Sequence, residues 1–212
     1  VHTVHTAMPE FLPIRTRTTR QLLKTLDASS SNGPDLVATR VLKNCADTLA
    51  LPLTRLARRV LHSGVWPNLW KLHWIIPLYK KRAVYNAENY RGVHLTSQVA
   101  KIIERLLGLH LVKHLESVGA FDDNQFAYLK EKRYKDALAR NTLQWILWIH
   151  LRKKVGVYCS DVAGAFDKVE DVRLLQKLHG RGVRGNFLDL LSSWLRGRVG
   201  TVCVEGRKSV ER

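Results

Sequence analysis

The stretch Val155-Gly-Val-Tyr-Cys-Ser-Asp161-Val-Ala-Gly-Ala-Phe-Asp-Lys-Val169 decides how the rest of this sequence is interpreted. Its first half is a short apolar run that ends on a carboxylate, a pattern typical of a strand that delivers an acidic residue to a sheet edge. Phosphoryl transfer from a nucleotide requires carboxylates that hold divalent metal ions at fixed positions. Asp161 is therefore a candidate metal ligand, with a turn or cap aspartate as an equal alternative. Asp167 fits better as the N-cap of a following helix.

Apolar periodicity on both sides of this stretch predicts a mixed α+β fold. Helices are expected at residues 35–49, 53–63, 98–118, 134–152, 166–179 and 185–196. Strands are expected at 73–79, 155–161 and 199–204, and residues 89–97 should form a loop and a short strand. Pro52 should break or kink the chain between the first two helices, and Pro77 should move its strand toward an edge. Thr96 or Ser97 should cap the third helix and Gly119 should end it. The final strand should enter a hairpin.

The expected helix at 134–152 carries a stripe of apolar residues, and such stripes are usually buried. We therefore predict that its core-facing side chains are Ala137, Leu138, Trp145, Leu147, Trp148 and Leu151.

Residues 1–34 hold few apolar anchors and end in the turn-forming run Ala28-Ser-Ser-Ser-Asn-Gly-Pro34. They predict a lead-in or linker before a single domain at residues 35–212.

Charge is the strongest compositional signal, because 35 Lys and Arg against 18 Asp and Glu give a net charge of +17. No acidic residue occurs from Thr48 to Ala87. The cations of that stretch include Arg55, Arg58, Arg59, Lys71, Lys80, Lys81 and Arg82. A surface of this kind attracts polyanions, so these residues are candidate nucleic-acid contacts. A ribosomal, membrane-facing or merely solubilising basic face is the alternative.

Three widely spaced cysteines without a CxxC pair argue against a disulfide framework and a zinc site. No uncharged stretch is long enough to cross a bilayer, and the first residues lack the pattern of a secretory signal. We therefore expect a soluble protein of a reducing, intracellular compartment without a membrane partner. Because the sequence starts at Val1, we also expect it to be a fragment.

Residues 161–169 resemble the first catalytic motif of reverse transcriptases from non-LTR (LINE-type) retrotransposons, in which an Asp ends a palm strand and Ala-Phe-Asp follows. Five upstream elements are similar to that family's finger motifs in order and spacing. They are Trp66-Pro67 with Trp70-Lys71, Ile76-Pro-Leu-Tyr-Lys-Lys81, Asn89-Tyr-Arg-Gly-Val-His-Leu-Thr96, residues 101–104, and Gln125-Phe-Ala-Tyr128. The resemblance implies the fingers and first part of the palm of a right-hand polymerase, with a partial antiparallel sheet flanked by helices.

The resemblance assigns expected roles to matching positions. Asp161 would be the catalytic metal ligand, and the backbone carbonyl of Val162 would be a second oxygen ligand for Mg²⁺, or alternatively Mn²⁺. Phe166 would lie under the sugar of the incoming nucleotide, with a buried core phenylalanine as the alternative. Arg91 and Lys80 or Lys81 would approach the triphosphate, where cations neutralise charge on the transferring phosphoryl group.

Two departures limit what the resemblance implies. The usual Arg-Pro-Ile-Ser-Leu is Arg91-Gly-Val-His-Leu95 here, and residues 129–136 are rich in lysine where a glycine-containing turn is common. The glycine-rich and Ala-Asp-Asp motifs expected further on do not occur in the printed sequence. We therefore expect these residues alone to be unable to complete the metal site or to polymerise.

The expected function is RNA-directed DNA synthesis, in which a primer 3′-hydroxyl attacks a dNTP. The partners would be an RNA template, a DNA primer and dNTP, with no obligate protein partner, and the nucleus is a plausible location. One alternative is a non-catalytic, basic nucleic-acid-binding remnant of a decayed element. A weaker alternative is a structural domain whose basic surface meets a protein or anionic lipid.

Overall fold

The computed structural model describes residues 6–9, 12–130 and 132–210. Residues 1–5 and 10–11 of the predicted lead-in, Glu131, and the last two residues lie outside this description. The helices are α1 (Thr16–Lys24), α2 (Thr39–Asn44), α3 (Ala46–Ser63), α4 (Gln98–Ser117), α5 (Tyr134–His150), α6 (Asp171–Gly180) and α7 (Gly185–Leu195), with short 3₁₀ turns η1 (Asn68–Trp70) and η2 (Ala87–Asn89). The strands are β1 (Leu72–Tyr79), β2 (Tyr90–Leu95), β3 (Val199–Val204) and β4 (Arg207–Lys208). The predicted mixed α+β class is confirmed.

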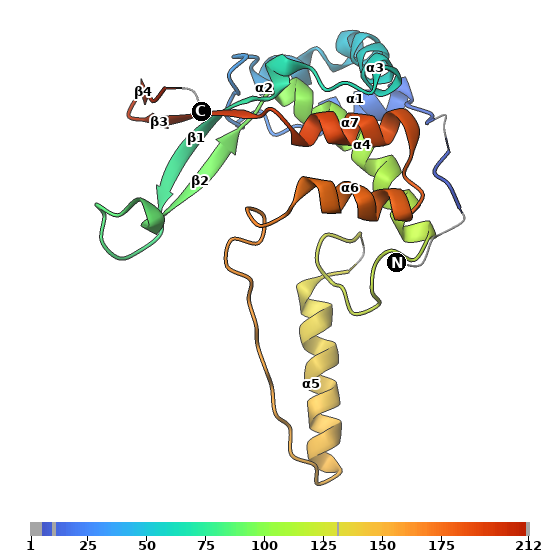
Figure 1. The fold of residues 1–212 in the computed structure, drawn as a ribbon, viewed down its shortest axis with the longest axis vertical. Helices are drawn as coiled ribbons and strands as arrows, with labels where there is room; N and C mark the ends of the chain where they lie inside the picture. Colours follow the sequence, from blue (N-terminus) through green and yellow to red (C-terminus); the bar gives the residue numbers. More distant parts are fainter. Residues whose placement is uncertain (1–5, 10–11, 131, 211–212) are drawn as a thin grey trace.

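The four strands form one sheet in the order β2-β1-β3-β4. β1 pairs antiparallel with β2, from Trp74 opposite Leu95 to Tyr79 opposite Tyr90, and β3 pairs antiparallel with β4. The β1–β3 pair is parallel, so the sheet is mixed rather than wholly antiparallel. Its crossover contains the helices α4 to α7 (Figure 1).

Pro77 lies where one side of β1 has no partner strand. The parallel pairing with β3 covers Leu72 to Ile75 only, whereas the pairing with β2 continues past Pro77. Proline lacks a backbone donor and is tolerated at such a position. The prediction of an edge therefore holds for this part of β1 but is wrong for its first half, which lies between two strands.

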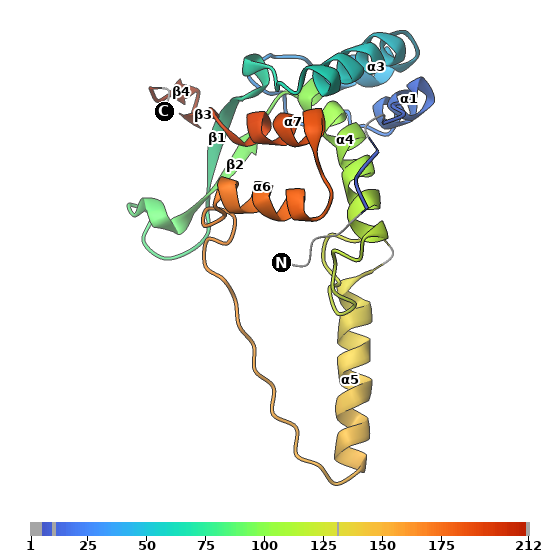
Figure 2. The same cartoon turned by 45° about the vertical axis from the view of Figure 1, so that its right-hand side comes forward.

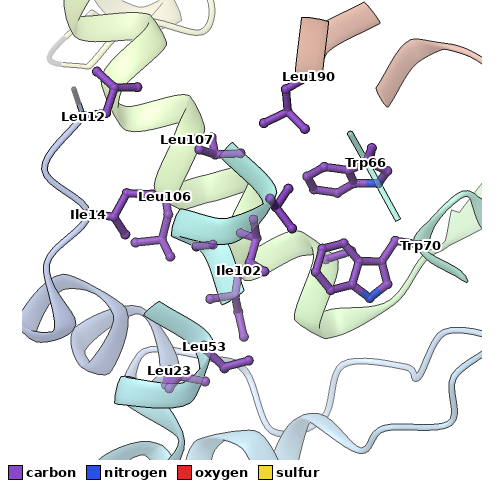
Figure 3. Packing of buried hydrophobic residues seen from close by; sticks show 14 of the residues in the cluster. Leu12, Ile14, Leu23, Leu53, Trp66, Trp70, Ile102, Leu106, Leu107 and Leu190 are labelled. Atoms are coloured by element: carbon purple, nitrogen blue, oxygen red, sulfur yellow. The ribbon is translucent and has the colours of Figure 1, made fainter. Parts of the chain in front are cut away.

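The helical body, which we define as α1, α3, α4 and α7, surrounds the main apolar core. α1 packs on α3 and α4, and α3 also packs on α7. Figure 3 shows side chains from these helices meeting Trp66 and Trp70, whose rings make an edge-to-face contact with centroids 5.2 Å apart. The backbone N–H of Trp66 donates to Ser193 Oγ at 2.9 Å, which ties the segment before η1 to α7.

Part of the predicted lead-in belongs to this core. Leu12, Ile14 and Leu23 are buried, and the hydroxyls of Thr19 on α1 and Thr54 on α3 share a buried hydrogen bond of 2.7 Å. The helix was missed because its apolar positions are few and separated by arginine and threonine. α1 nevertheless buries them against α3 and α4, so these residues do not behave as a linker.

Pro52 lies inside α3 and does not separate two helices. The break falls instead at Cys45, where α2 ends and α3 begins. Pro52 is on the exposed face of α3, so the Thr48 carbonyl that loses its helical donor can bind water. The prediction of a break at Pro52 was therefore wrong.

α4 confirms its prediction closely. Ser97 is the N-cap, and its Oγ accepts a hydrogen bond from the Ala100 N–H at 3.2 Å. Gly119 follows the helix with a φ of +60°, the left-handed conformation that glycine adopts at helix ends.

The projecting segment, which we define as residues 121–170, leaves the helical body and returns to it (Figures 1 and 2). It contains α5, which buries none of its residues. The prediction that Leu138, Leu147 and Leu151 face a core is wrong for the described chain, because no other described element packs extensively on α5. Trp145 and Trp148 are only partly covered.

The return part of this segment is not a strand. Residues 153–162 have no regular secondary structure, and Tyr158 is 90% exposed. A strand needs a partner to bind its backbone groups, and no described strand pairs with these residues. α6 begins at Asp171 and its N-cap is Glu170, so the predicted start at Phe166 and the predicted cap at Asp167 are both wrong.

Within the described residues, no helix has the length and apolar character needed to span a membrane.

Candidate functional site

The β1–β2 hairpin brings predicted nucleotide-binding cations to one end of the sheet. Arg91 lies opposite Leu78 in the strand register. The Lys80 N–H donates to the Asn89 carbonyl at 2.8 Å and extends the pairing beyond the strand ends. Lys80 and Arg91 therefore share the outer end of the hairpin, which projects from the helical body in Figure 1.

The loop that joins these strands, residues 80–89, is fixed through three consecutive carbonyl groups. The Tyr79 hydroxyl donates to the Arg82 carbonyl. The Asn89 side chain donates to the Ala83 carbonyl at 2.8 Å, and the Tyr90 hydroxyl donates to the Val84 carbonyl at 2.7 Å. These bonds hold Arg82 with a φ of +77°, a conformation uncommon for residues other than glycine.

The tyrosines at the base of the loop also contact one another. Tyr79 and Tyr90 are directly opposite in the register, and their rings meet edge to face with centroids 5.6 Å apart. Aromatic cross-strand pairs of this kind stabilise antiparallel strands. The sequence interpretation missed Tyr79, Asn89 and Tyr90 as supports of the loop, although their positions on either side of the basic run were the available signal.

The loop presents an exposed cationic surface. Four cations are exposed at this end of the hairpin, namely Lys80, Lys81, Arg82 and, on β2, Arg91. Glu88 is the single acidic residue in the sequence from 80 to 91. None of these four cations forms a salt bridge with a described residue. Their charge is therefore available to an anionic ligand.

The predicted cations on α3 divide into two kinds. Arg55 and Arg59 are exposed and lie one helical turn apart, so they share a face. Arg58 donates to the Ile14 carbonyl from Nε at 3.1 Å and from Nη2 at 2.6 Å. Its guanidinium ties the segment before α1 to α3, a structural role that the sequence did not indicate.

Lys71 lies in a third place, at the start of β1. It is half-buried, and its backbone carbonyl accepts a hydrogen bond from the Val199 N–H at 3.1 Å, where β3 begins. The predicted nucleic-acid contacts are thus spread over the hairpin loop, the α3 face and the β1–β3 junction.

Asp161, Val162 and Phe166 all lie on the exposed return part of the projecting segment. Asp161 forms no hydrogen bond or salt bridge with another described residue. Phe166 is 81% exposed, so the alternative of a buried core phenylalanine is wrong. The segment holds these residues outside the core.

The described residues do not form a complete metal site. They contain no group of three or more His, Cys, Asp or Glu side chains that could hold a metal ion. Asp161 and the Val162 carbonyl are hard oxygen ligands of the kind that Mg²⁺ prefers, but two such groups do not fill its coordination shell.

A histidine pair lies at the base of the β1–β2 hairpin. The rings of His73 on β1 and His94 on β2 lie with centroids 4.8 Å apart. Burial is the main cause that lowers the pKa of His73, and the nearby His94 and Arg198 lower it further against a hydrogen bond to the Lys71 carbonyl. His73 therefore favours its neutral form.

No family model matches the chain. The chain is 26% identical over 171 residues to the probable RNA-directed DNA polymerase from transposon X-element of Drosophila melanogaster, a match covering 78% of this chain and 18% of that protein. It is 24% identical over 201 residues to the probable RNA-directed DNA polymerase from transposon BS of the same organism, covering 94% and 22%. The chain thus spans 18% to 22% of these curated relatives. The resemblance to reverse transcriptases of retrotransposons that its motifs predict is confirmed over most of its length.

Proposed function

We propose that the chain forms part of an RNA-directed DNA polymerase of a non-LTR retrotransposon. The observation that carries this proposal is the hairpin loop of a chain similar to transposon polymerases. The loop is internally fixed, and together with Arg91 on β2 it presents four exposed cations that form no salt bridge with a described residue. Such a polymerase binds an RNA template, a DNA primer and a dNTP. The primer 3′-hydroxyl attacks the α-phosphorus of the dNTP, and pyrophosphate leaves.

In this proposal the predicted residues bind different parts of the substrates. Lys80, Lys81 and Arg91 neutralise charge on the triphosphate, and Phe166 lies under the sugar of the incoming nucleotide. Contacts to template and primer phosphates come from Arg55, Arg59, Lys71 and Arg82, whereas Arg58 contributes charge from a guanidinium already bound to Ile14.

Asp161 and the Val162 carbonyl supply ligands for Mg²⁺ in the proposed polymerase, and Mn²⁺ has the same ligand preference. The metal would activate the attacking hydroxyl and stabilise charge on the phosphate. The printed residues contain no Ala-Asp-Asp sequence, so a polypeptide of these 212 residues is expected to bind nucleic acid without extending a primer.

A second candidate function is nucleic-acid binding without catalysis. It is favoured by the exposed position of Asp161 and by the absence of a metal-binding cluster among the described residues. The two candidates differ in whether the protein selects a dNTP as well as a strand.

The test is to measure binding of an RNA template annealed to a DNA primer as a function of salt, and then binding of dNTP to that complex with Mg²⁺. Substituting Arg59, which is assigned to a strand phosphate, by alanine should lower the salt slope of strand binding by about one. Arg91→Ala should instead weaken dNTP binding, whereas Asp161→Asn should weaken only the Mg²⁺-dependent binding of dNTP.

Lys177→Ala is the matched control, because Lys177 is an exposed cation on α6, away from the hairpin. Lys177→Ala should leave both the salt slope of strand binding and the affinity for dNTP unchanged. Strand binding without dNTP binding would favour the non-catalytic candidate. Absence of salt-dependent strand binding would contradict both and favour the structural domain, and templated extension by the 212-residue polypeptide would contradict its expected inactivity.

A further inference from the structure

The loop at residues 80–89 displays one aromatic side chain that its internal bonds do not use. Tyr85 is 91% exposed. Tyr79 and Tyr90, which flank the same loop, instead commit their hydroxyls to loop carbonyls and their rings to each other. The loop therefore has two supporting tyrosines and one that projects into solvent.

The supports fix the backbone directly before Tyr85. The three carbonyls that receive side-chain donors belong to Arg82, Ala83 and Val84. On the other side, the Asn86 N–H donates to the Ala83 carbonyl at 3.3 Å, and the Asn86 side chain accepts from the Glu88 N–H at 3.0 Å. Tyr85 thus lies between two bonded residues and is held outward at the tip of the hairpin.

A single exposed aromatic residue usually needs no explanation. Here three further conditions coincide. The loop backbone is held by its own hydrogen bonds, tyrosine has only two side-chain torsions to fix, and four exposed cations lie at the same end of the hairpin. An aromatic ring within a cationic groove is the arrangement by which proteins bind unpaired nucleic-acid strands.

We propose that Tyr85 is a stacking platform for an unpaired base of a single-stranded nucleic acid, with Arg82 holding a neighbouring phosphate. This inference rests on the proposed function for the strand it binds, and it adds a contact to the base itself. Stacking is tolerant of sequence because every base offers a π-face. The platform should therefore select unpaired bases over paired ones and show little preference among the four bases.

The test measures fluorescence anisotropy of the 212-residue chain with three labelled ligands: a single-stranded RNA, a duplex, and a strand of equal length whose central nucleotides lack bases. Tyr85→Ala should weaken binding of the base-bearing single strand about ten-fold. Binding of the duplex and of the abasic strand should change less than two-fold. Tyr85→Phe keeps the ring and should bind like the native chain.

The salt dependence separates stacking from charge. Tyr85→Ala should leave the salt slope unchanged, whereas Arg82→Ala should lower it by about one and weaken binding of all three ligands. Tyr158→Ala is the control, because Tyr158 is equally exposed but lies in residues 155–160, which have no regular secondary structure and none of the backbone hydrogen bonds that hold the hairpin loop. Circular dichroism and thermal melting confirm that each variant folds, as expected where the replaced ring is exposed.

Two results would overturn the platform. One is native-like binding of the base-bearing strand by Tyr85→Ala; the other is an equal loss on the abasic strand. Both leave the proposed function intact, since the native chain still binds. If the native chain binds none of the ligands in a salt-dependent way, the proposed function fails as well.

Discussion

The helical body and the projecting segment contain similar apolar side chains but bury them to different extents. Ile102 on α4 is fully buried, as is Leu23 on α1. On α5, Leu143 and Ile149 are more than half exposed although they belong to an equally apolar run. An apolar stripe therefore predicts a helix, but burial depends on whether another element of the described chain covers it.

The largest effect is expected from truncating the core of the helical body. Ile102→Ala should lower the free energy of unfolding by about 2 to 5 kcal/mol, because the lost methylene groups leave a cavity among packed neighbours. Leu143→Ala is the matched change on α5 and should alter it by less than about 0.5 kcal/mol. Urea titration followed by circular dichroism measures both.

An equal loss of unfolding free energy in Ile102→Ala and Leu143→Ala would contradict the difference in burial between the helical body and the projecting segment. It would mean that α5 is covered in solution, for instance by a second copy. Sedimentation of the native chain at two concentrations would then show association.

An intermediate effect is expected at Gly33, where a Cβ atom would lie only 2.4 Å from the Thr96 carbonyl carbon. Gly33→Ala must displace backbone at the start of α4, and overpacking of this kind costs about 1 to 3 kcal/mol. At Gly156, in the projecting segment, a Cβ would meet nothing within 4 Å. Gly156→Ala should leave the melting temperature unchanged or slightly raise it, and a parallel drop in both variants would contradict this expectation.

The smallest effect concerns pH and His73. Its pKa is lowered from 6.5 chiefly by burial, so below about pH 6.5 the unfolded chain binds more protons at this site than the folded chain. Stability should therefore fall as pH decreases through this range and recover as it rises. Burial likewise lowers the pKa of His110 and adds to the same slope.

Thermal melts between pH 5 and pH 7.5 measure this dependence. His73→Gln removes one titrating group and should flatten the slope. His150→Gln changes an exposed histidine on α5 and should retain it. A slope that His73→Gln leaves unaltered would exclude His73 as its source.

Local signals predicted the elements whose ends depend on neighbouring residues. Ser97 and Gly119 predicted the two ends of α4, because capping depends on residues within one helical turn. The break predicted at Pro52 was wrong, because the effect of a proline depends on whether the Thr48 carbonyl reaches solvent. That depends on which face of α3 packs inward. The strand expected at 155–161 failed because pairing requires a second strand.

For the candidate site, too, some features could be predicted from the sequence, whereas others depend on contacts between distant residues. Lys80 and Arg91 were grouped by the family resemblance, which assigns both to the triphosphate, and the strand register brings them to the same end of the hairpin. The tie between Arg58 and Ile14 joins residues 44 positions apart, and no local pattern indicates it. The three supports of the hairpin loop were visible as residues, but their roles depend on the register that sets Tyr79 against Tyr90.

The contact between Trp66 and Ser193 spans 127 positions, and the parallel β1–β3 pair closes a loop of similar length around the projecting segment. Closing a flexible loop becomes costlier only slowly with length, by about 0.6 kcal/mol for each doubling. Insertions or deletions within residues 121–170 should therefore change the equilibrium little. Their influence should fall on kinetics, because contacts between distant residues slow folding. The β1–β2 hairpin can form early, whereas β3 and α7 can join the core only after the entire intervening chain has been made.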